Sequence, residues 1–174
     1  MGCFSEEKIA ELIKNQAVFL MRGLPGSGKT TWVRKTFVGK DYGIYSADDY
    51  FMKDGKYEFK FEEASKAHDW VLRRFLDGLT QPYLVNGPSV VDNTNLFALD
   101  MAPYIALARA FHRPFCIVTI YENLEVAQKR NLHGIDQATF NRKADWFVHE
   151  RLPKFWLPYH HEVRNSELAP EISG

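Results

Sequence analysis

The sequence has little cysteine, no excess of either charge and no long apolar run. Its two cysteines, Cys3 and Cys116, lie far apart and lack metal-ligand spacing, which excludes a disulfide framework and a cysteine-based metal site. A reduced, cytoplasmic location fits this pattern. The 22 basic residues balance the 22 acidic residues, so the formal net charge is zero. Wrapping of long duplex nucleic acid requires many cationic contacts and is therefore disfavoured, although a local basic groove remains open.

Membrane-spanning and multidomain architectures are also disfavoured. No stretch is long and apolar enough to span a bilayer, and no segment has the pattern of a secretory signal. The 174 residues suit one domain and contain no internal repeat or linker. We therefore expect a single monomeric domain over 1–174, with a core at about 17–152 and an irregular tail at 153–174.

The strongest motif is the segment 23–30, which reads GLPGSGKT and fits the P-loop pattern G-x-x-x-x-G-K-[ST] without a substitution. A short apolar run precedes it, and 31–35 can continue as a helix. Successive backbone N–H groups and the positive end of the following helix would then hold phosphate oxygens. The alternative is a glycine-rich turn that fits by chance. The predicted nucleotide-binding residues are Gly23, Pro25, Gly26, Ser27, Gly28, Lys29, Thr30 and Thr31.

Two side chains of this segment have specific expected roles. Lys29 would reach the β- and γ-phosphates, and the hydroxyl of Thr30 would hold Mg²⁺. No Asn-Lys-x-Asp segment is present to recognise guanine. A small chain with an acidic pair after its second predicted strand indicates a kinase rather than a GTPase or a motor.

The remaining pattern predicts an α/β fold. Apolar runs at 17–21, 43–46, 88–91 and 115–120 predict strands, and helical periodicity predicts intervening helices that include 61–77, 124–132 and 136–151. Gly78 is expected to end the first of these helices, and Pro103 to lie in or near the first turn of another. Alternating strands and helices predict a three-layer parallel sheet of four to five strands with helices on both faces.

Ligands of such sheets bind outside the carboxyl ends of the strands, where three polar groups converge: the P-loop, the acidic pair and the segment after the third strand. Asp48 is placed to accept the proton of an acceptor hydroxyl. The alternative for this acidic pair is helix capping, which is the role we expect for Asp49. Asp92 resembles a Walker B carboxylate that holds Mg²⁺ through water, or else it is a turn residue. Asn93 and Asn95 would position an acceptor or close the turn.

Other candidates have equally ordinary alternatives. Arg130 would neutralise charge on the γ-phosphate from a lid, or it is a solvated surface arginine. Aromatic residues that include Tyr50 and Trp70 occur among lysines, a pattern that suits base stacking or the packing of a small lid. Asp49 and Tyr50 are also candidate substrate contacts. His68 lies on the apolar face of a helix and is expected to be a partly buried structural histidine.

Four segments together resemble the bacteriophage-type polynucleotide kinases and their AAA-like P-loop relatives. They read GLPGSGKTTW at 23–32, SADDY at 46–50, VDNTN at 91–95 and KRNLHG at 129–134. The resemblance spans about 18–146 and implies a P-loop nucleotide-kinase-like fold that transfers the γ-phosphate of ATP to a hydroxyl. It assigns Lys29 and Thr30 to the P-loop, Asp48 to the general base and Arg130 to the lid arginine.

Two departures from this family concern the acceptor. The phage kinases have an arginine directly after their Asp-Asp-Tyr, where this sequence has Phe51, and their third carboxylate falls at the position of Asn93. The acceptor therefore stays open between a nucleic acid, at a 5′-hydroxyl end or a hydroxymethyl group of a modified DNA base, and a small nucleoside-like alcohol. A non-catalytic ATP-binding module is a third hypothesis, which the intact Lys29, Thr30 and Asp48 disfavour.

Overall fold

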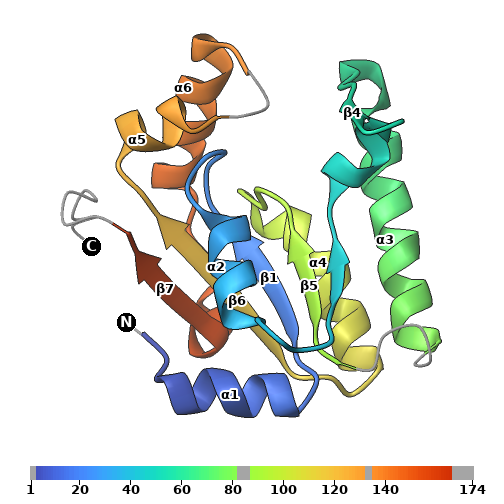
Figure 1. Cartoon of the computed structure of the whole chain (residues 1–174). Helices are drawn as coiled ribbons and strands as arrows, with labels where there is room; N and C mark the ends of the chain where they lie inside the picture. The colour runs from blue at the N-terminus through green and yellow to red at the C-terminus, as the bar shows by residue number, and fades with distance from the viewer. Residues whose placement is uncertain (1–2, 82–86, 132–134, 166–174) are drawn as a thin grey trace.

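The chain folds around a parallel sheet of five strands in the order β2-β5-β1-β6-β7, as seen in a computed structural model (Figure 1). The structure describes residues 3–81, 87–131 and 135–165. A short antiparallel hairpin pairs β3 with β4 outside that sheet. The predicted parallel sheet of four to five strands is confirmed. The strands are β1 Val18–Arg22, β2 Gly43–Tyr45, β3 Met52–Lys53, β4 Lys56–Tyr57, β5 Ser89–Asp92, β6 Phe115–Tyr121 and β7 His160–Arg164.

Helices cover both faces of the sheet, which confirms the predicted three layers (Figure 1). Side chains alternate along a strand, so Val18 and Leu20 enter a core with α3 and α4, whereas Phe19 and Met21 pack on α1 and α2. Among the described residues no helix is long and apolar enough to cross a bilayer. The helices are α1 Glu6–Lys14, α2 Lys29–Thr36, α3 Ala64–Thr80, α4 Ala98–Ala110, α5 Leu124–Lys129 and α6 Gln137–His149, with 3-10 helices η1 Ala47–Phe51, η2 Phe61–Glu63 and η3 Lys154–Tyr159.

The strand order brings three connections to the same edge of the sheet. β5 pairs in parallel with β1 on one side and with β2 on the other. The segments that follow β1, β5 and β2 therefore leave the carboxyl edge next to one another, with the segment after β5 in the middle. Beyond this edge, helices α5 and α6 stand on one side of the molecule and the β3–β4 hairpin on the other (Figure 1).

The predicted irregular tail at 153–174 is wrong for residues 154–164, which form η3 and β7. β7 reads HHEVR, and its single apolar residue gave no strand signal. The strand forms because it pairs in parallel with β6, with His160 opposite Ile117. His160 is buried, and its Nε2 lies 2.7 Å from Oγ1 of Thr119 on β6. Residues 166–174 lie outside the described part of the chain.

Three smaller expectations are also corrected. α3 does not end at Gly78 but continues to Thr80. A Cβ atom on Gly78 would lie 1.9 Å from the Tyr45 hydroxyl oxygen, so this glycine serves the close contact between α3 and β2. Pro103 lies beyond the first turn of α4, which begins at Ala98. His68 is exposed on α3 rather than partly buried.

Candidate active site

The P-loop connects β1 to α2 and is enclosed by neighbouring backbone. The Gly23 N–H donates to the carbonyl oxygen of Thr94, in the segment after β5, at 3.0 Å. A Cβ atom on Gly26 would lie 2.0 Å from the carbonyl oxygen of Ala127, so α5 leaves room only for glycine there. Gly28, with φ of 96°, is the N-cap residue that directs α2 away from the loop. All predicted nucleotide-binding residues lie in this loop or in the first turn of α2.

Lys29 is buried beneath the loop that precedes it. Its Nζ donates to the carbonyl oxygens of Gly23, at 3.0 Å, and Leu24, at 2.9 Å. Burial lowers the pKa of Lys29 to about 8, while the negative charges of Asp92 and Asp48 act in the opposite direction. Because Lys29 interacts with both carboxylates, the groups that follow β1, β5 and β2 share one electrostatic environment, as the sequence predicts.

Thr30 and Asp92 are brought together at the first turn of α2. The Thr30 hydroxyl donates to Oδ2 of Asp92 at 2.8 Å, and burial raises the pKa of this carboxyl group. Mg²⁺ prefers oxygen ligands and keeps several waters, so this hydroxyl and carboxylate fit the ion. Within the described residues no group of three or more His, Cys, Asp or Glu side chains could hold a metal.

Asp48 lies in η1, directly after β2. Ser46 caps this helix by accepting from the Asp48 N–H at 3.3 Å, so Asp48 is not the cap. The hydroxyl of Tyr57, on the β3–β4 hairpin, donates to Oδ1 of Asp48 at 3.0 Å. Burial, followed by the Asp48 charge, raises the pKa of Tyr57. The hydroxyl therefore stays protonated and fixes one oxygen of a carboxylate that is otherwise exposed.

Asp49 has a different environment from its neighbour. Its Oδ2 lies 3.2 Å from Nη1 of Arg74 on α3, in an ion pair whose side chains are 46% and 41% exposed. The capping role expected of Asp49 is wrong, because Ser46 takes that position. The ion pair links η1 to α3 and engages the Asp49 carboxylate with Arg74, so the role of proton acceptor stays with Asp48.

The two asparagines after β5 differ in their contacts. Asn93 accepts the Ala47 N–H at 2.9 Å through Oδ1, and its buried Nδ2 has no partner within the described residues. Asn95 is buried and donates from Nδ2 to the Met21 carbonyl oxygen at 2.7 Å. Asn93 therefore offers a free donor beside η1, whereas Asn95 ties the turn to β1.

Arg130 is the C-cap residue of α5, whose backbone lies against the P-loop. Its Nη1 lies 3.0 Å from Oε2 of Glu122, a carboxylate that is 4% exposed at the end of β6, while Arg130 itself is 59% exposed. The guanidinium is thus anchored on one side and open to solvent on the other. Residues 132–134 of the motif that suggested Arg130 lie outside the described part of the chain.

Two further residues reach this region without any sequence signal. Asn165, just after β7, donates from Nδ2 to the Ser27 carbonyl oxygen at 2.8 Å and so supports the P-loop from beyond the last strand of the sheet. Lys143 on α6 interacts electrostatically with Lys29 and Asp48, and burial lowers the pKa of Lys143. Both contacts join residues more than 90 positions apart in the sequence, and no local motif marks them.

The aromatic residues between 50 and 60 form a small cluster of their own. Phe51 is 3% exposed, and its ring lies 4.9 Å from that of Phe59 and 6.2 Å from that of Tyr57. For Phe51, this arrangement supports the packing alternative over base stacking. Tyr50 and Trp70, by contrast, are only half-buried.

Comparison with known proteins identifies sequence relatives. A sequence profile of the family described as AAA domain matches residues 18–133. The human protein NEDD4-binding protein 2 is 33% identical over 135 residues, which cover 74% of this chain. The chain spans only 7% of the length of that protein.

Solved structures show the same fold at low sequence identity. A chain in the structure of the Pnkp1/Rnl/Hen1 RNA repair complex matches with a TM-score of 0.59 and 16% identity, over 75% of this chain and 43% of that chain. A gluconokinase from Sinorhizobium meliloti 1021 matches with a TM-score of 0.53 and 12% identity, over 90% and 87% of the two chains. Because the AAA domain profile covers residues 18–133, from β1 through α5, and includes every strand that leads into the site, the chain belongs to the AAA domain family.

Proposed function

We propose that this chain is an ATP-dependent kinase that transfers the γ-phosphate to a hydroxyl group of a nucleic acid. One observation carries the proposal: Lys29 interacts electrostatically with both Asp92 and Asp48, while Asp92 accepts the Thr30 hydroxyl. A phosphate-binding cation, a metal-binding pair of oxygens and a proton acceptor are thereby assembled at one edge of the sheet. Phosphoryl transfer requires these groups together because it depends on positioning and charge neutralisation.

The residues divide the reaction between them. P-loop N–H groups would bind the phosphates, and Lys29 would exchange its two carbonyl partners for the β- and γ-phosphate oxygens. Thr30 and Asp92 would hold Mg²⁺, which neutralises phosphate charge when bound. Arg130 would add positive charge from α5. The side chain of Asn93 has a free donor for the acceptor or the γ-phosphate.

Asp48 would orient the acceptor hydroxyl and take its proton. The hydroxyl oxygen forms a bond to the γ-phosphorus, the bond from that phosphorus to the bridging oxygen of ADP breaks, and the proton moves to the Asp48 carboxylate. The Tyr57 hydroxyl donates to Oδ1 of Asp48 and so holds the carboxylate in place beside the acceptor. A loose transition state makes this orientation as important as the basicity of the carboxylate.

The nucleic-acid acceptor is the finer part of the proposal. The fold is shared with a chain of an RNA repair complex, and half-buried aromatic rings and cations flank η1. The hydroxyl would be a 5′ end, as in the phage-type kinases that the motifs resemble, or a hydroxymethyl group of a modified DNA base. Phe51 is buried against the rings of Tyr57 and Phe59, so it does not take over the acceptor contact that the arginine makes in those kinases.

A small alcohol is the second candidate acceptor. The gluconokinase matches 90% of this chain, more than the RNA-repair chain does, and its name specifies a small polyhydroxylated substrate. A module that binds ATP without catalysis remains the least supported alternative, because it would not require Tyr57 to hold Asp48.

The test is incubation of the purified chain with γ-labelled ATP and Mg²⁺ against 5′-hydroxyl DNA and RNA oligonucleotides, hydroxymethylated DNA, nucleosides and gluconate. We expect label on one of the nucleic acids. Lys29→Ala should abolish transfer without unfolding the chain, because it removes the cation from the β- and γ-phosphates. Efficient labelling of only nucleosides or gluconate would refute the nucleic-acid acceptor, and full activity of a folded Lys29→Ala variant would refute the site.

A further inference from the structure

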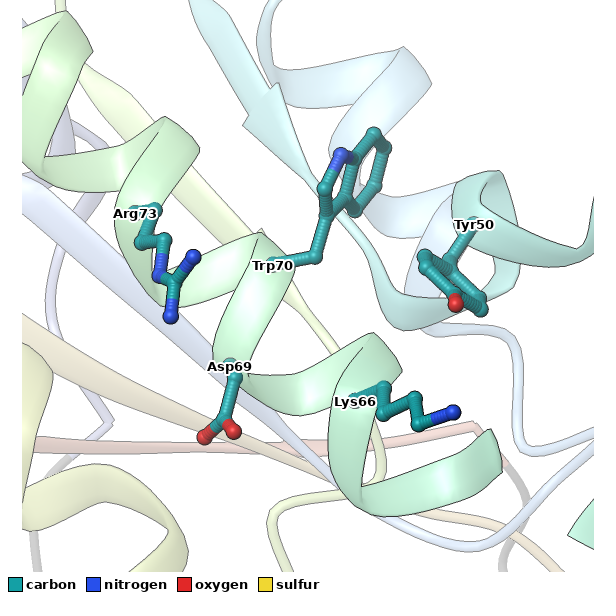
Figure 2. Close-up of a pocket in the computed structure, with 5 residues that line it drawn as sticks. All are labelled: Tyr50, Lys66, Asp69, Trp70 and Arg73. Carbon is teal, nitrogen blue, oxygen red and sulfur yellow. The ribbon is translucent and has the colours of Figure 1, made fainter. Parts of the chain in front are cut away.

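A pocket of about 260 Å³ opens between η1 and α3, outside the P-loop and the groups assigned to ATP and Mg²⁺ (Figure 2). Tyr50 approaches it from η1, and the other lining residues belong to successive turns of α3. Tyr50 is two positions after Asp48, so an occupant of the pocket would lie close to the candidate base. The lining residues are Tyr50, Lys66, Asp69, Trp70 and Arg73.

The pocket has an aromatic wall that the protein holds in place. The rings of Tyr50 and Trp70 lie 5.7 Å apart, edge to face. Arg74 lies over the Trp70 ring, 4.6 Å from its centroid, and the same guanidinium forms the ion pair with Asp49. The wall is therefore linked through Arg74 to Asp49, the residue next to the candidate base.

The other lining side chains are charged and exposed. Lys66, Asp69 and Arg73 form no hydrogen bond or ion pair within the described residues, although their spacing along α3 would permit Asp69 to pair with either cation. Seven residues separate Lys66 from Arg73, which places their Cα atoms about 10.5 Å apart along the helix. The two cations are thus suited to two different phosphates, with Asp69 between them as a hydrogen-bond acceptor.

We infer that this pocket binds a nucleotide of a single-stranded acceptor, with the base against Tyr50 and Trp70 and the flanking phosphates at Lys66 and Arg73. Aromatic rings beside cations form the combination that binds single strands without strong sequence preference. Asp69 accepts a hydrogen bond from a base amino group or a sugar hydroxyl, which a purely anionic ligand could not donate. The inference rests on the proposed function and adds to it the surface that selects a strand over a free nucleoside.

The experiment measures binding of a fluorescent 5′-hydroxyl oligonucleotide by anisotropy, with an unreactive ATP analogue bound, across a range of salt concentrations. The test variant is Lys66→Ala/Arg73→Ala. The matched control is Arg34→Ala/Lys35→Ala, which removes one lysine and one arginine from exposed positions in the last turn of α2.

The charge variant, Lys66→Ala/Arg73→Ala, should lose two phosphate contacts. The negative slope of log affinity against log salt should therefore become shallower by about 1.4. At 0.1 M salt this loss corresponds to about 25-fold weaker binding. Tyr50→Ala should weaken binding by about 5- to 150-fold with little change in the slope, because stacking does not depend on salt. The control should retain both the affinity and the slope of the unmodified chain.

Phosphorylation assays separate this inference from the proposed function. We expect the charge variant to raise KM for an oligonucleotide while its activity on a 5′-hydroxyl dinucleoside stays near that of the unmodified chain. If oligonucleotides bind and are phosphorylated, but test and control variants behave alike, the pocket assignment is overturned and the kinase stands. If an acidic peptide competes for the pocket as well as the oligonucleotide does, the nucleotide assignment is likewise overturned. If no oligonucleotide binds while a small alcohol is phosphorylated, the proposed acceptor fails and the inference falls with it.

Discussion

Acid should destabilise this fold through His160, the first residue of β7. The side chain is 9% exposed, and its Nε2 lies 2.7 Å from Thr119 Oγ1. Burial lowers the pKa of His160 to about 4, and the charges of Arg22 and His161 act in the same direction, while Glu162 opposes them. The folded chain therefore keeps this imidazole neutral at pH values where the unfolded chain, with a histidine pKa near 6.5, has protonated it.

The sign and size of the effect follow from proton linkage. Between the two pKa values the unfolded state binds more protons, so the free energy of unfolding falls as the pH drops from about 6.5 to about 4. From pH 7 to pH 5 the loss is about 2 kcal/mol, and it approaches about 3 kcal/mol at pH 4. Burial also lowers the pKa of His161, which adds a contribution of the same sign.

Urea unfolding at pH 7 and pH 5 measures this loss directly. His160→Gln can still hydrogen-bond Thr119 but cannot titrate, so the difference between the two pH values should shrink by about 2 kcal/mol. His68→Gln, at an exposed position of α3, is the control and should preserve the difference. Equal losses in the unmodified chain and in His160→Gln would refute a buried, neutral His160.

Four further substitutions test the site and the packing beside it. Asp48→Asn keeps the shape of the side chain but removes the proton acceptor, so turnover should fall by about 10²- to 10⁴-fold with nearly unchanged ATP affinity. Asp49→Asn breaks a half-exposed ion pair and should change stability by less than about 1 kcal/mol with far less effect on turnover; reversed phenotypes would move the base to Asp49. Gly78→Ala would place a Cβ 1.9 Å from the Tyr45 hydroxyl oxygen and should cost about 1–3 kcal/mol of unfolding free energy in a thermal or urea titration. Tyr45→Phe removes that oxygen, so failure of this change to recover part of the cost would rule out the proposed clash.

The sequence predicts the sheet and the convergence at its edge because these depend on local patterns. Apolar runs mark four strands, of which β1, β5 and β6 are buried on both faces, and the P-loop motif specifies its own loop and helix. The polar groups that follow β1, β2 and β5 are predicted at one edge whatever the strand order, because the carboxyl ends of parallel strands share an edge. The contact between Thr30 and Asp92, which are 62 positions apart, follows from that rule.

The features that the sequence does not reveal depend on distant partners. β7 is a strand because β6 offers an open edge and Thr119 satisfies His160, and neither fact is visible in HHEVR itself. Gly78 has the residue type of a helix end, yet Tyr45 from another element explains its presence. Tyr57 reaches the site from the β3–β4 hairpin and Asn165 from the segment after β7, so only the folded arrangement shows that they contribute.

The position of β7 also bears on whether copies of this protein could associate through the edges of the sheet. As the outermost strand it exposes main-chain groups that could template the addition of a strand from another molecule. Glu162 and Arg164, which pair at 3.3 Å, place charge along this strand, and the Cys3 thiol contacts the Glu162 carbonyl oxygen at 3.6 Å. The opposite edge, β2, is only three residues long. Both borders of the sheet thus discourage amyloid-like growth, and a partner protein would be expected to dock on helices or loops rather than extend the sheet.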